Sequence, residues 1–237
     1  LGTLNPDKIH GGISIKNLTF SYITGEKVLH GINLEIKPGE KIAVVGATGA
    51  GKSTIINLLS RFYEFDEGLI LLDKNSIKDF SLNGLRKHIG IVLQDVFLFA
   101  DTIYNNITLY DTDIDEEDVY YAAKEIGVHD FILSLPGGYQ YNVKERGVML
   151  SSGQRQLISF LRVYLSNPSI LILDEATSSI DSYAEEMIKS ATRKITKGKT
   201  SILIAHRLST IKNTDRIVVM EKGNIVEIGS HKELLAN

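Results

Sequence analysis

The amino-acid sequence predicts an α/β fold in which helices pack against a parallel β-sheet. The main observation is that short apolar runs alternate with helical stretches from residue 169 onward. Parallel strands need such an order, because a crossover, usually a helix, must carry the chain back between them. A second observation is that the opening third is rich in strand-like runs and has one strong helix. The composition, 43% hydrophobic and 23% charged over 237 residues, fits one large domain or two joined lobes.

The opening third is predicted to be mostly strand. Segments that alternate apolar and polar residues, or form short β-branched or apolar runs, are the expected strands: 13–22, 32–36, 41–46, 69–73 and 89–94. Pro38-Gly39 is expected to form a turn. Residues 52–63 form the expected helix, with four apolar side chains at helical spacing: Ile55, Ile56, Leu59 and Phe62.

The middle of the chain is predicted to be helical. Residues 111–136 begin with an acidic run, which we interpret as carboxylates at a helix N-terminus rather than as an interaction tail. A further helix is expected from residue 151 to 165, where Asn167 and Pro168 stop it.

The last third is predicted to alternate strand and helix. Residues 169–175 and 200–206 are continuous apolar runs, which indicate buried strands, and residues 181–195 are expected to be the helix between them. Two further runs, 216–220 and 225–229, flank a turn-like tetrapeptide and predict a hairpin.

Several function classes are disfavoured by composition. The chain has no cysteine, which excludes disulfides and thiolate metal sites, and its net charge of −3 gives no reason to expect nucleic acid or an anionic membrane surface. Its longest apolar runs are far shorter than a membrane span needs, so we expect that this chain does not cross a bilayer by itself. The polar, Gly-rich start, residues 1–12, is interpreted as a linker entering a domain and not as a signal peptide.

A phosphate-binding loop is the strongest motif. Residues 46–53, from Gly46 to Ser53, fit the pattern G-x-x-x-x-G-K-[ST] between a predicted strand and a predicted helix. The glycines let backbone N–H groups face a phosphate, and the helix N-terminus adds partial positive charge. Lys52 is expected to reach the β- and γ-phosphates and Ser53 to ligate Mg²⁺. The alternative is a Gly-rich turn without a ligand.

Two acids end a predicted buried strand. Asp174 and Glu175 close the run "ILILDE", and the carboxyl ends of strands are where open α/β sheets bind ligands. Asp174 is expected to hold Mg²⁺ through water and Glu175 to act as the general base on the attacking water. The alternative is an ordinary acidic strand end.

A second predicted helix start, far along the chain, is also suited to an anion. Ser151 and Gln154 satisfy a capping box, and Gly153 lets a ligand approach the backbone closely. Taken alone, the pattern fits a structural cap better than a ligand site.

The stretch "LSSGQRQ", lying between a phosphate loop and "ILILDEAT", resembles the signature of ATP-binding-cassette (ABC) ATPases, and the resemblance covers nearly the whole chain. It implies a P-loop NTPase, RecA-like core with a parallel sheet, an antiparallel β subdomain and an inserted α-helical subdomain over about 96–166. Residues 13–237 would be the ABC ATPase domain, and residues 1–12 the linker from a transmembrane domain. One departure is Ser152, which stands where the family usually has glycine.

The resemblance also implies roles for single residues. Tyr22 would stack on adenine with Val28 close by, and Gln94 would ligate Mg²⁺ and report the nucleotide state to a membrane partner. His206 would contact the γ-phosphate, and Glu145 would lie in a segment that touches the membrane domains. The residues expected to contact nucleotide are Tyr22, Val28, Thr48, Gly49, Ala50, Gly51, Lys52, Ser53, Thr54, Gln94, Ser151, Gly153, Gln154 and Asp181. The expected metal ligands are Ser53, Gln94 and Asp174, and the expected catalytic residues are Glu175, His206 and Lys52.

The function implied by the resemblance is that of an exporter-type nucleotide-binding domain. Two cassettes, identical or related, would pair head to tail, so that the phosphate loop of one and the signature helix of the other bind the same ATP. Mg²⁺-dependent hydrolysis would then power export through a transmembrane domain, at the cytoplasmic face of what we expect to be a bacterial inner membrane.

Three other functions compete with this one. A soluble ABC ATPase acting on DNA or ribosomes usually has tandem cassettes, long insertions or basic surfaces, and this chain has a net charge of −3. A regulatory module that binds ATP without turnover would not need Glu175. A P-loop kinase for small molecules would not need the signature stretch.

Overall fold

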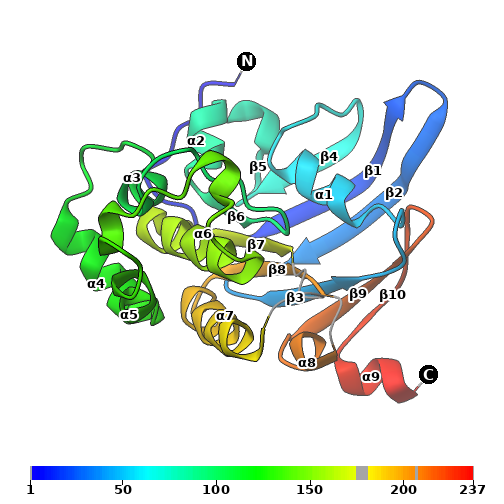
Figure 1. Ribbon diagram of the computed structural model, residues 1–237. Coiled ribbons are helices and arrows are strands. Elements are labelled where there is room, and N and C mark those ends of the chain that lie inside the picture. The colour runs from blue at the N-terminus through cyan, green and yellow to red at the C-terminus, as the bar shows by residue number, and fades with distance from the viewer. Residues whose placement is uncertain (1, 175–180, 206–207, 237) are drawn as a thin grey trace. The chain divides into compact units, whose positions relative to one another are not determined.

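The computed structural model describes residues 2–174, 181–205 and 208–236 (Figure 1). The chain forms two compact units. The sheet unit takes the described residues within 1–90, 168–175 and 198–237, and the helical unit takes those within 91–167 and 176–197.

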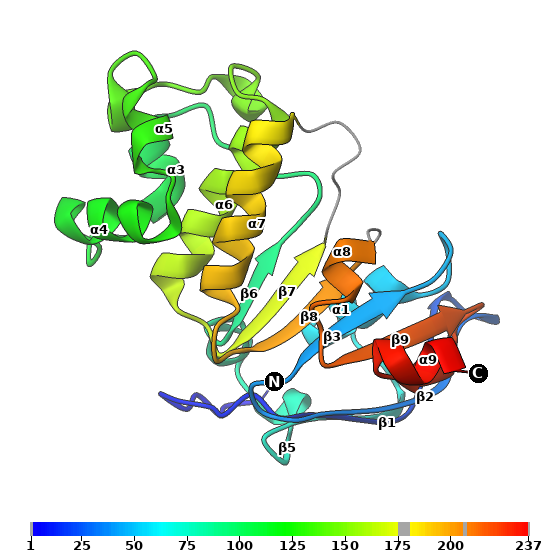
Figure 2. The same ribbon diagram turned by 90° about the horizontal axis from the view of Figure 1, so that it is seen from below.

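The larger sheet has the strand order β10-β9-β3-β8-β7-β6. Figure 2 shows its strands from β9 to β6 side by side. β3 pairs in parallel with both β8 and β9, and β8 pairs in parallel with β7, which confirms the predicted parallel sheet. The strands are β3 (Lys41–Val45), β6 (Ile89–Val92), β7 (Ile170–Asp174), β8 (Thr200–Ile204), β9 (Arg216–Glu221) and β10 (Asn224–Gly229). β7 and β8 are almost wholly buried, as expected for parallel strands covered on both faces.

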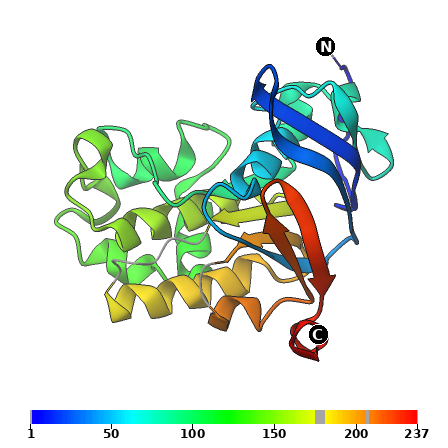
Figure 3. The same ribbon diagram turned by 90° about the vertical axis from the view of Figure 1, so that its right-hand side faces the viewer.

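The predicted hairpin near the C-terminus is confirmed. β10 pairs antiparallel with β9, and Figure 3 shows this pair leading into the last helix, α9 (His231–Ala236). The turn of the hairpin contacts the phosphate loop, because the Gly223 N–H donates to the Ala50 carbonyl at 3.1 Å.

A second sheet of the sheet unit is antiparallel, with the order β2-β1-β4-β5. Its strands are β1 (Ile13–Ile23), β2 (Glu26–Ile36), β4 (Glu67–Leu72) and β5 (Asn75–Ser76). β2 begins six residues earlier than the predicted strand 32–36. Its first half lacks strict apolar alternation but pairs with β1, from Glu26 opposite Ile23 to Leu29 opposite Phe20.

The helix after the phosphate loop, α1, spans Lys52–Leu59, so the predicted end at residue 63 is wrong. The chain leaves the helix at Ser60, and Arg61 adopts φ 48°, which a helix cannot continue through. Phe62, predicted to continue the helical spacing, lies beyond the end of α1 for the same reason and is 54% exposed. Ile55, Ile56 and Leu59 are buried as expected.

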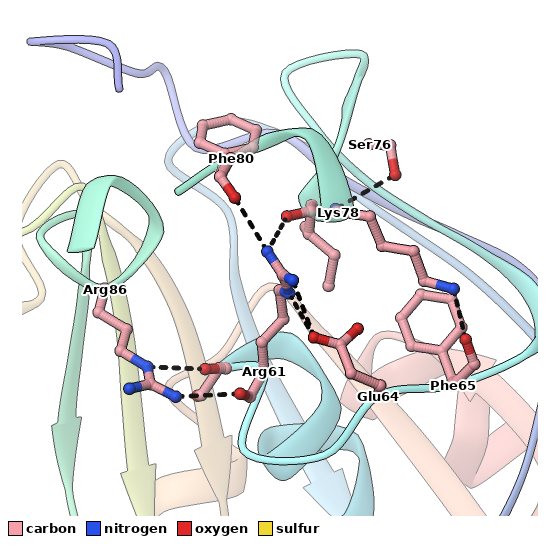
Figure 4. Close-up of polar contacts among 9 residues, drawn as sticks. Arg61, Glu64, Phe65, Ser76, Lys78, Phe80 and Arg86 are labelled. Carbon is pink, nitrogen blue, oxygen red and sulfur yellow. Dashed lines mark hydrogen bonds and ion pairs between the residues drawn. The ribbon is translucent and has the colours of Figure 1, made fainter. Parts of the chain in front are cut away.

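Two arginines hold the C-terminal end of α1 (Figure 4). Arg86 donates to the carbonyls of Ser60, the C-cap of α1, and of Arg61, the residue after it, at 3.2 and 3.0 Å. The buried side chain of Arg61 donates to the carbonyls of Ile77 and Phe80 at 3.1 and 2.9 Å. The helix is thus fixed to the segment that follows β5.

The chain's first described residues lie along the sheet unit. The Leu4 N–H donates to the Asp79 carbonyl at 2.8 Å, and the Leu4 carbonyl accepts from the Ser81 N–H at 2.9 Å. The Gly11 carbonyl accepts from the Thr200 hydroxyl at 2.8 Å. The segment interpreted as a linker is therefore held at both of these places.

The remaining short elements of the sheet unit are helical. They are the 3-10 turn Ile77–Asp79, α2 (Leu82–Arg86) and α8 (Leu208–Ile211).

The helices of the helical unit come from both of its chain segments. They are α3 (Ile103–Thr108), α4 (Glu116–Ile126), α5 (His129–Leu133), α6 (Ser152–Ser166) and α7 (Ser182–Ile195), with 3-10 turns at Gly138–Gln140 and Glu145–Gly147. α6 packs beside α7, as Figure 2 shows, and both contact α4. In the described part of the chain, no helix has the length and apolar character that a membrane crossing demands.

Two predicted helix boundaries in this unit are confirmed. Asp115 caps α4, and its first turn carries three carboxylates, so the acidic run is a helix start. α6 ends at Asn167 in the left-handed conformation, directly before Pro168.

Candidate functional site

The loop between β3 and α1 depends on glycines at two close approaches. Gly51, the residue before α1, has φ 101°, and a Cβ there would lie 2.7 Å from Leu29 Cδ2. At Gly46 a Cβ would lie 2.3 Å from the carbonyl oxygen of Met220. A helix preceded by glycine has no capping side chain, so the N–H groups of its first turn can face an anion.

Lys52 places a cation at this loop. Its Nζ donates to the carbonyls of Gly46 and Ala47 at 2.7 and 2.9 Å, and the residue is buried. Burial lowers the pKa of Lys52, and the carboxylate of Asp174 opposes part of that shift. The Lys52 ammonium therefore lies in the field of Asp174, the acid that ends β7.

Two oxygen donors at this site suit a magnesium ion. Ser53, the second residue of α1, is exposed, and Asp174, the last residue of β7, is half-exposed. Mg²⁺ prefers hydroxyl, carboxylate and water oxygens and usually takes only one or two carboxylates. The next acid, Glu175, and the histidine at 206 both lie outside the described residues.

The other predicted residues of the loop lie around it. Thr48 and Gly49 are exposed, whereas Ala50 and Thr54 are buried. The Val28 carbonyl oxygen is 3.5 Å from the point where a Cβ on Gly51 would lie, so Val28 adjoins the loop.

Tyr22, the predicted adenine platform, is tied to α1. Its hydroxyl donates to Thr54 Oγ1 at 3.2 Å and accepts from Asn57 Nδ2 at 3.0 Å. Its ring meets those of Phe20 and Tyr63 edge to face, at 4.9 and 4.8 Å between centroids. Tyr22, on β1, and the phosphate loop are therefore both joined to α1.

The start of α6 has the predicted capping box. Ser151 Oγ accepts from the Gln154 N–H at 3.2 Å, and Gln154 Oε1 accepts from the Ser151 N–H at 2.9 Å. Ser151 and Ser152 are exposed, and Gly153 is buried. The hydroxyl hydrogen of Ser151 is not used in the capping box, so it can be donated to an incoming acceptor.

The remaining predicted residues also belong to the helical unit. Gln94 is exposed in the segment after β6, and Glu145 is exposed at the start of a 3-10 turn. Asp181 caps α7, where its Oδ1 accepts from the N–H groups of Tyr183 and Ala184 at 3.1 and 2.9 Å. Its carboxylate therefore already has structural partners within its own chain.

The sequence interpretation missed a partly buried polar cluster of the helical unit, centred on Arg162. Arg162 on α6 donates to the Phe97 carbonyl and to Asn106 Oδ1, both at 3.0 Å, and burial lowers the pKa of Arg162 to about 10. Asn106 in turn donates to the Phe99 carbonyl at 3.0 Å. The available signal was an arginine inside the apolar run "SFLRVYL", since a charge in such a run needs partners.

Comparisons with known proteins identify the family of the chain. The family model described as "ABC transporter" matches residues 29–178, which include the phosphate loop and the start of α6. A solved structure of a bacterial Atm1-family ABC exporter with ATP bound superposes with a TM-score of 0.90 at 41% sequence identity, over 99% of this chain and 41% of that chain.

Curated relatives are similar over almost the full chain. A candidate multidrug export ATP-binding/permease protein of Bacillus subtilis strain 168 is 47% identical over 98% of this chain, and a similarly named protein of Staphylococcus aureus strain NCTC 8325 is 50% identical over 95%. The matched region spans 40% and 39% of the length of these two relatives. The chain therefore belongs to the ABC transporter family, as an ATP-binding cassette of the exporter type and hence an ATPase domain.

Proposed function

We propose that this cassette hydrolyses ATP with Mg²⁺ and that the energy drives export through a transmembrane domain. The observation that carries the proposal is the start of α1, which has no side-chain cap, holds the buried cation of Lys52 and lies in the field of Asp174. A triphosphate with its metal is the ligand that such a combination of N–H groups, ammonium and carboxylate suits best.

The predicted site residues would divide the work at the phosphates. The N–H groups of the loop and Lys52 would bind the β- and γ-phosphate oxygens, where negative charge develops during transfer. Ser53, Asp174 and Gln94 would hold the Mg²⁺, which supplies positive charge to the phosphates when bound. Glu175 would accept the proton of the attacking water, and His206 would hold the γ-phosphate.

A second cassette, identical or related, would complete the site. The exposed start of α6, with Ser151, Gly153 and Gln154, would contact the ATP that is bound to the other chain, and Asp181 would lie at the same interface. Contacts to the γ-phosphate that exist only before hydrolysis would make association depend on the nucleotide state. The related exporter structure has ATP bound, which supports a nucleotide as the ligand.

The membrane-bound part of the transporter would be the remaining partner. Relatives that are named ATP-binding/permease proteins are more than twice as long as the region they share with this chain. We propose that residues 1–12 connect to such a permease and that the segments around Gln94 and Glu145 contact it. The cassette would then work at the cytoplasmic face of a bacterial inner membrane.

The test is the variant Glu175→Gln, which keeps the shape of the side chain and removes the base. We expect phosphate release to fall by about a hundredfold or more, because general-base catalysis contributes about that much. The ATP-bound dimer should then accumulate on size-exclusion chromatography with Mg²⁺ and ATP. Glu117→Gln, at an exposed carboxylate in the first turn of α4, is the matched control and should behave as the parent.

Two results would contradict the proposal at different levels. Parental turnover in Glu175→Gln would reject the base assignment alone. A parent chain that neither releases phosphate nor associates with Mg²⁺ and ATP would reject the function itself.

A further inference from the structure

The hydroxyl of Tyr22 has two partners on the helix that begins at the phosphate loop. It donates to Thr54 at 3.2 Å and accepts from Asn57 at 3.0 Å. Thr54 is buried and directly follows the last residue of the loop motif, Ser53. Thr54 and Asn57 lie three residues apart on α1 and so share one face of the helix.

Two aromatic rings restrict the ring of Tyr22 as well. Phe20 and Tyr63 both meet it nearly perpendicularly, at interplanar angles of 87° and 85°. Edge-to-face contact is a favoured geometry for aromatic pairs and fixes ring orientation. Tyr22 itself remains 43% exposed, so part of its surface stays open to a ligand.

The segment that carries Tyr63 is itself held in place. Tyr63 lies between Arg61 and Glu64, whose side chains form an ion pair at 2.8 Å (Figure 4). Arg61 is further bonded to two main-chain carbonyls and is buried. The backbone that carries Tyr63 is therefore held by Arg61 before it and by Glu64 after it.

We propose that Asn57 and Tyr63 are positioning residues, which set Tyr22 as a pre-formed platform for the base of the nucleotide. This inference rests on the proposed ATP site. Because the platform and the phosphate loop are attached to the same helix, α1 fixes the spacing between base and triphosphate. A platform ordered in advance binds more tightly, since the ring loses less rotamer freedom when the base stacks on it.

The chemistry of the ligand makes the inference testable. Inorganic tripolyphosphate presents the phosphates of ATP without a base, so it uses the loop and not the platform. The readout is the ratio of the Kd for tripolyphosphate to the Kd for ATP, both measured with Mg²⁺ by calorimetry on the chain of residues 1–237. A variant that disturbs the phosphate loop itself changes the Kd for both ligands by a similar factor, so the ratio stays the same.

Asn57→Leu removes the donor and keeps similar volume. We expect ATP to bind about fivefold more weakly, the usual effect of one lost hydrogen bond, with tripolyphosphate unchanged. Asn57→Asp should restore most of the ratio, because the Tyr22 hydroxyl can donate to the carboxylate, and the added charge acts on both ligands. Asn33→Leu is the matched control, since the Asn33 amide donates to Asn17 and the Gly31 carbonyl in the same unit, away from α1.

A second variant separates positioning from general packing. Tyr22→Ala should weaken ATP about tenfold or more, because base stacking on an aromatic ring contributes about that much. In the Tyr22→Ala background, Asn57→Leu should have no further effect on the ratio, since a residue that acts through Tyr22 has nothing left to position.

The results for these variants separate the inference from the proposed function. A fivefold change in the ratio that disappears in the Tyr22→Ala background supports the inference. An unchanged ratio in Asn57→Leu, or an effect that persists without Tyr22, overturns it while the proposed function stands. A parent chain that binds neither ATP nor tripolyphosphate overturns the proposed function and the inference together.

Discussion

The two helices that the sequence predicts for phosphate binding begin in different ways. α1 starts after Gly51, without a side-chain cap, and Lys52 in its first turn points its Nζ at the carbonyls of the loop. α6 starts at Ser151, whose capping box already uses one N–H of the first turn and the N–H of the cap residue. The first helix start is therefore incomplete without an anion, and the second is complete as a structural cap.

This difference indicates how each helix start can contribute to nucleotide binding. An uncapped start with a buried cation favours an anion by itself, within one chain. A capped helix start has fewer groups left for a ligand. At α6 these are the hydroxyl hydrogen of Ser151 and the close approach to the backbone that Gly153 permits. We infer that α1 determines the affinity of a single chain for ATP, and that α6 contributes only to a nucleotide that is already bound elsewhere.

The largest expected effect is at α1. Lys52→Met should weaken ATP binding by the single chain about a hundredfold, because about two hydrogen bonds to charged oxygens are lost. Calorimetry with Mg²⁺ and ATP at concentrations where the chain is monomeric measures it. Lys16→Met removes an exposed lysine of the same unit and should leave the constant unchanged. Parental affinity in Lys52→Met would show that α1 is not the primary site.

A smaller effect is expected at α6. Ser151→Ala should lower the free energy of unfolding by about 1 kcal/mol, the usual cost of a lost serine cap, and leave ATP binding by the monomer unchanged. Urea denaturation followed by circular dichroism measures the first quantity, and calorimetry measures the second. Ser152→Ala is the matched control, because this exposed neighbour does not cap the helix. Weaker monomer binding in Ser151→Ala would place the serine at the nucleotide of its own chain.

Much of the sheet unit could be predicted from local patterns. Buried apolar runs identified β3, β7 and β8 because strands covered on both faces leave little room for polar residues. The phosphate loop was predictable because its glycines are required by close backbone contacts, as at Gly51. Helix periodicity gave the wrong helix end, because the apolar spacing continues to Phe62 although the backbone turns at Arg61.

What could not be predicted are contacts between segments far apart in sequence. The bond from Asn57 to Tyr22 joins residues 35 positions apart, and the bond from Arg162 to Phe97 joins residues 65 apart. The arginine in an apolar run indicates that polar partners exist, but neither it nor the asparagine on a helix indicates which distant residues those partners are. Glu175 and His206, whose roles come from the resemblance alone, lie outside the described residues.

The central claim is that the start of α1 in one chain and the start of α6 in another bind the same ATP. The most direct test mixes two variants that we expect to be inactive: Lys52→Met, which lacks the cation of the loop, and Ser151→Arg, which puts a long charged side chain at the start of α6. Differently tagged chains verify that mixed dimers form. One site of each mixed dimer then combines an intact α1 start with an intact α6 start. With random pairing, half of the dimers are mixed and half of their sites intact, so we expect about a quarter of parental ATPase activity. If mixed dimers form and the activity stays at the level of the separate variants, the two helix starts do not share a nucleotide between chains.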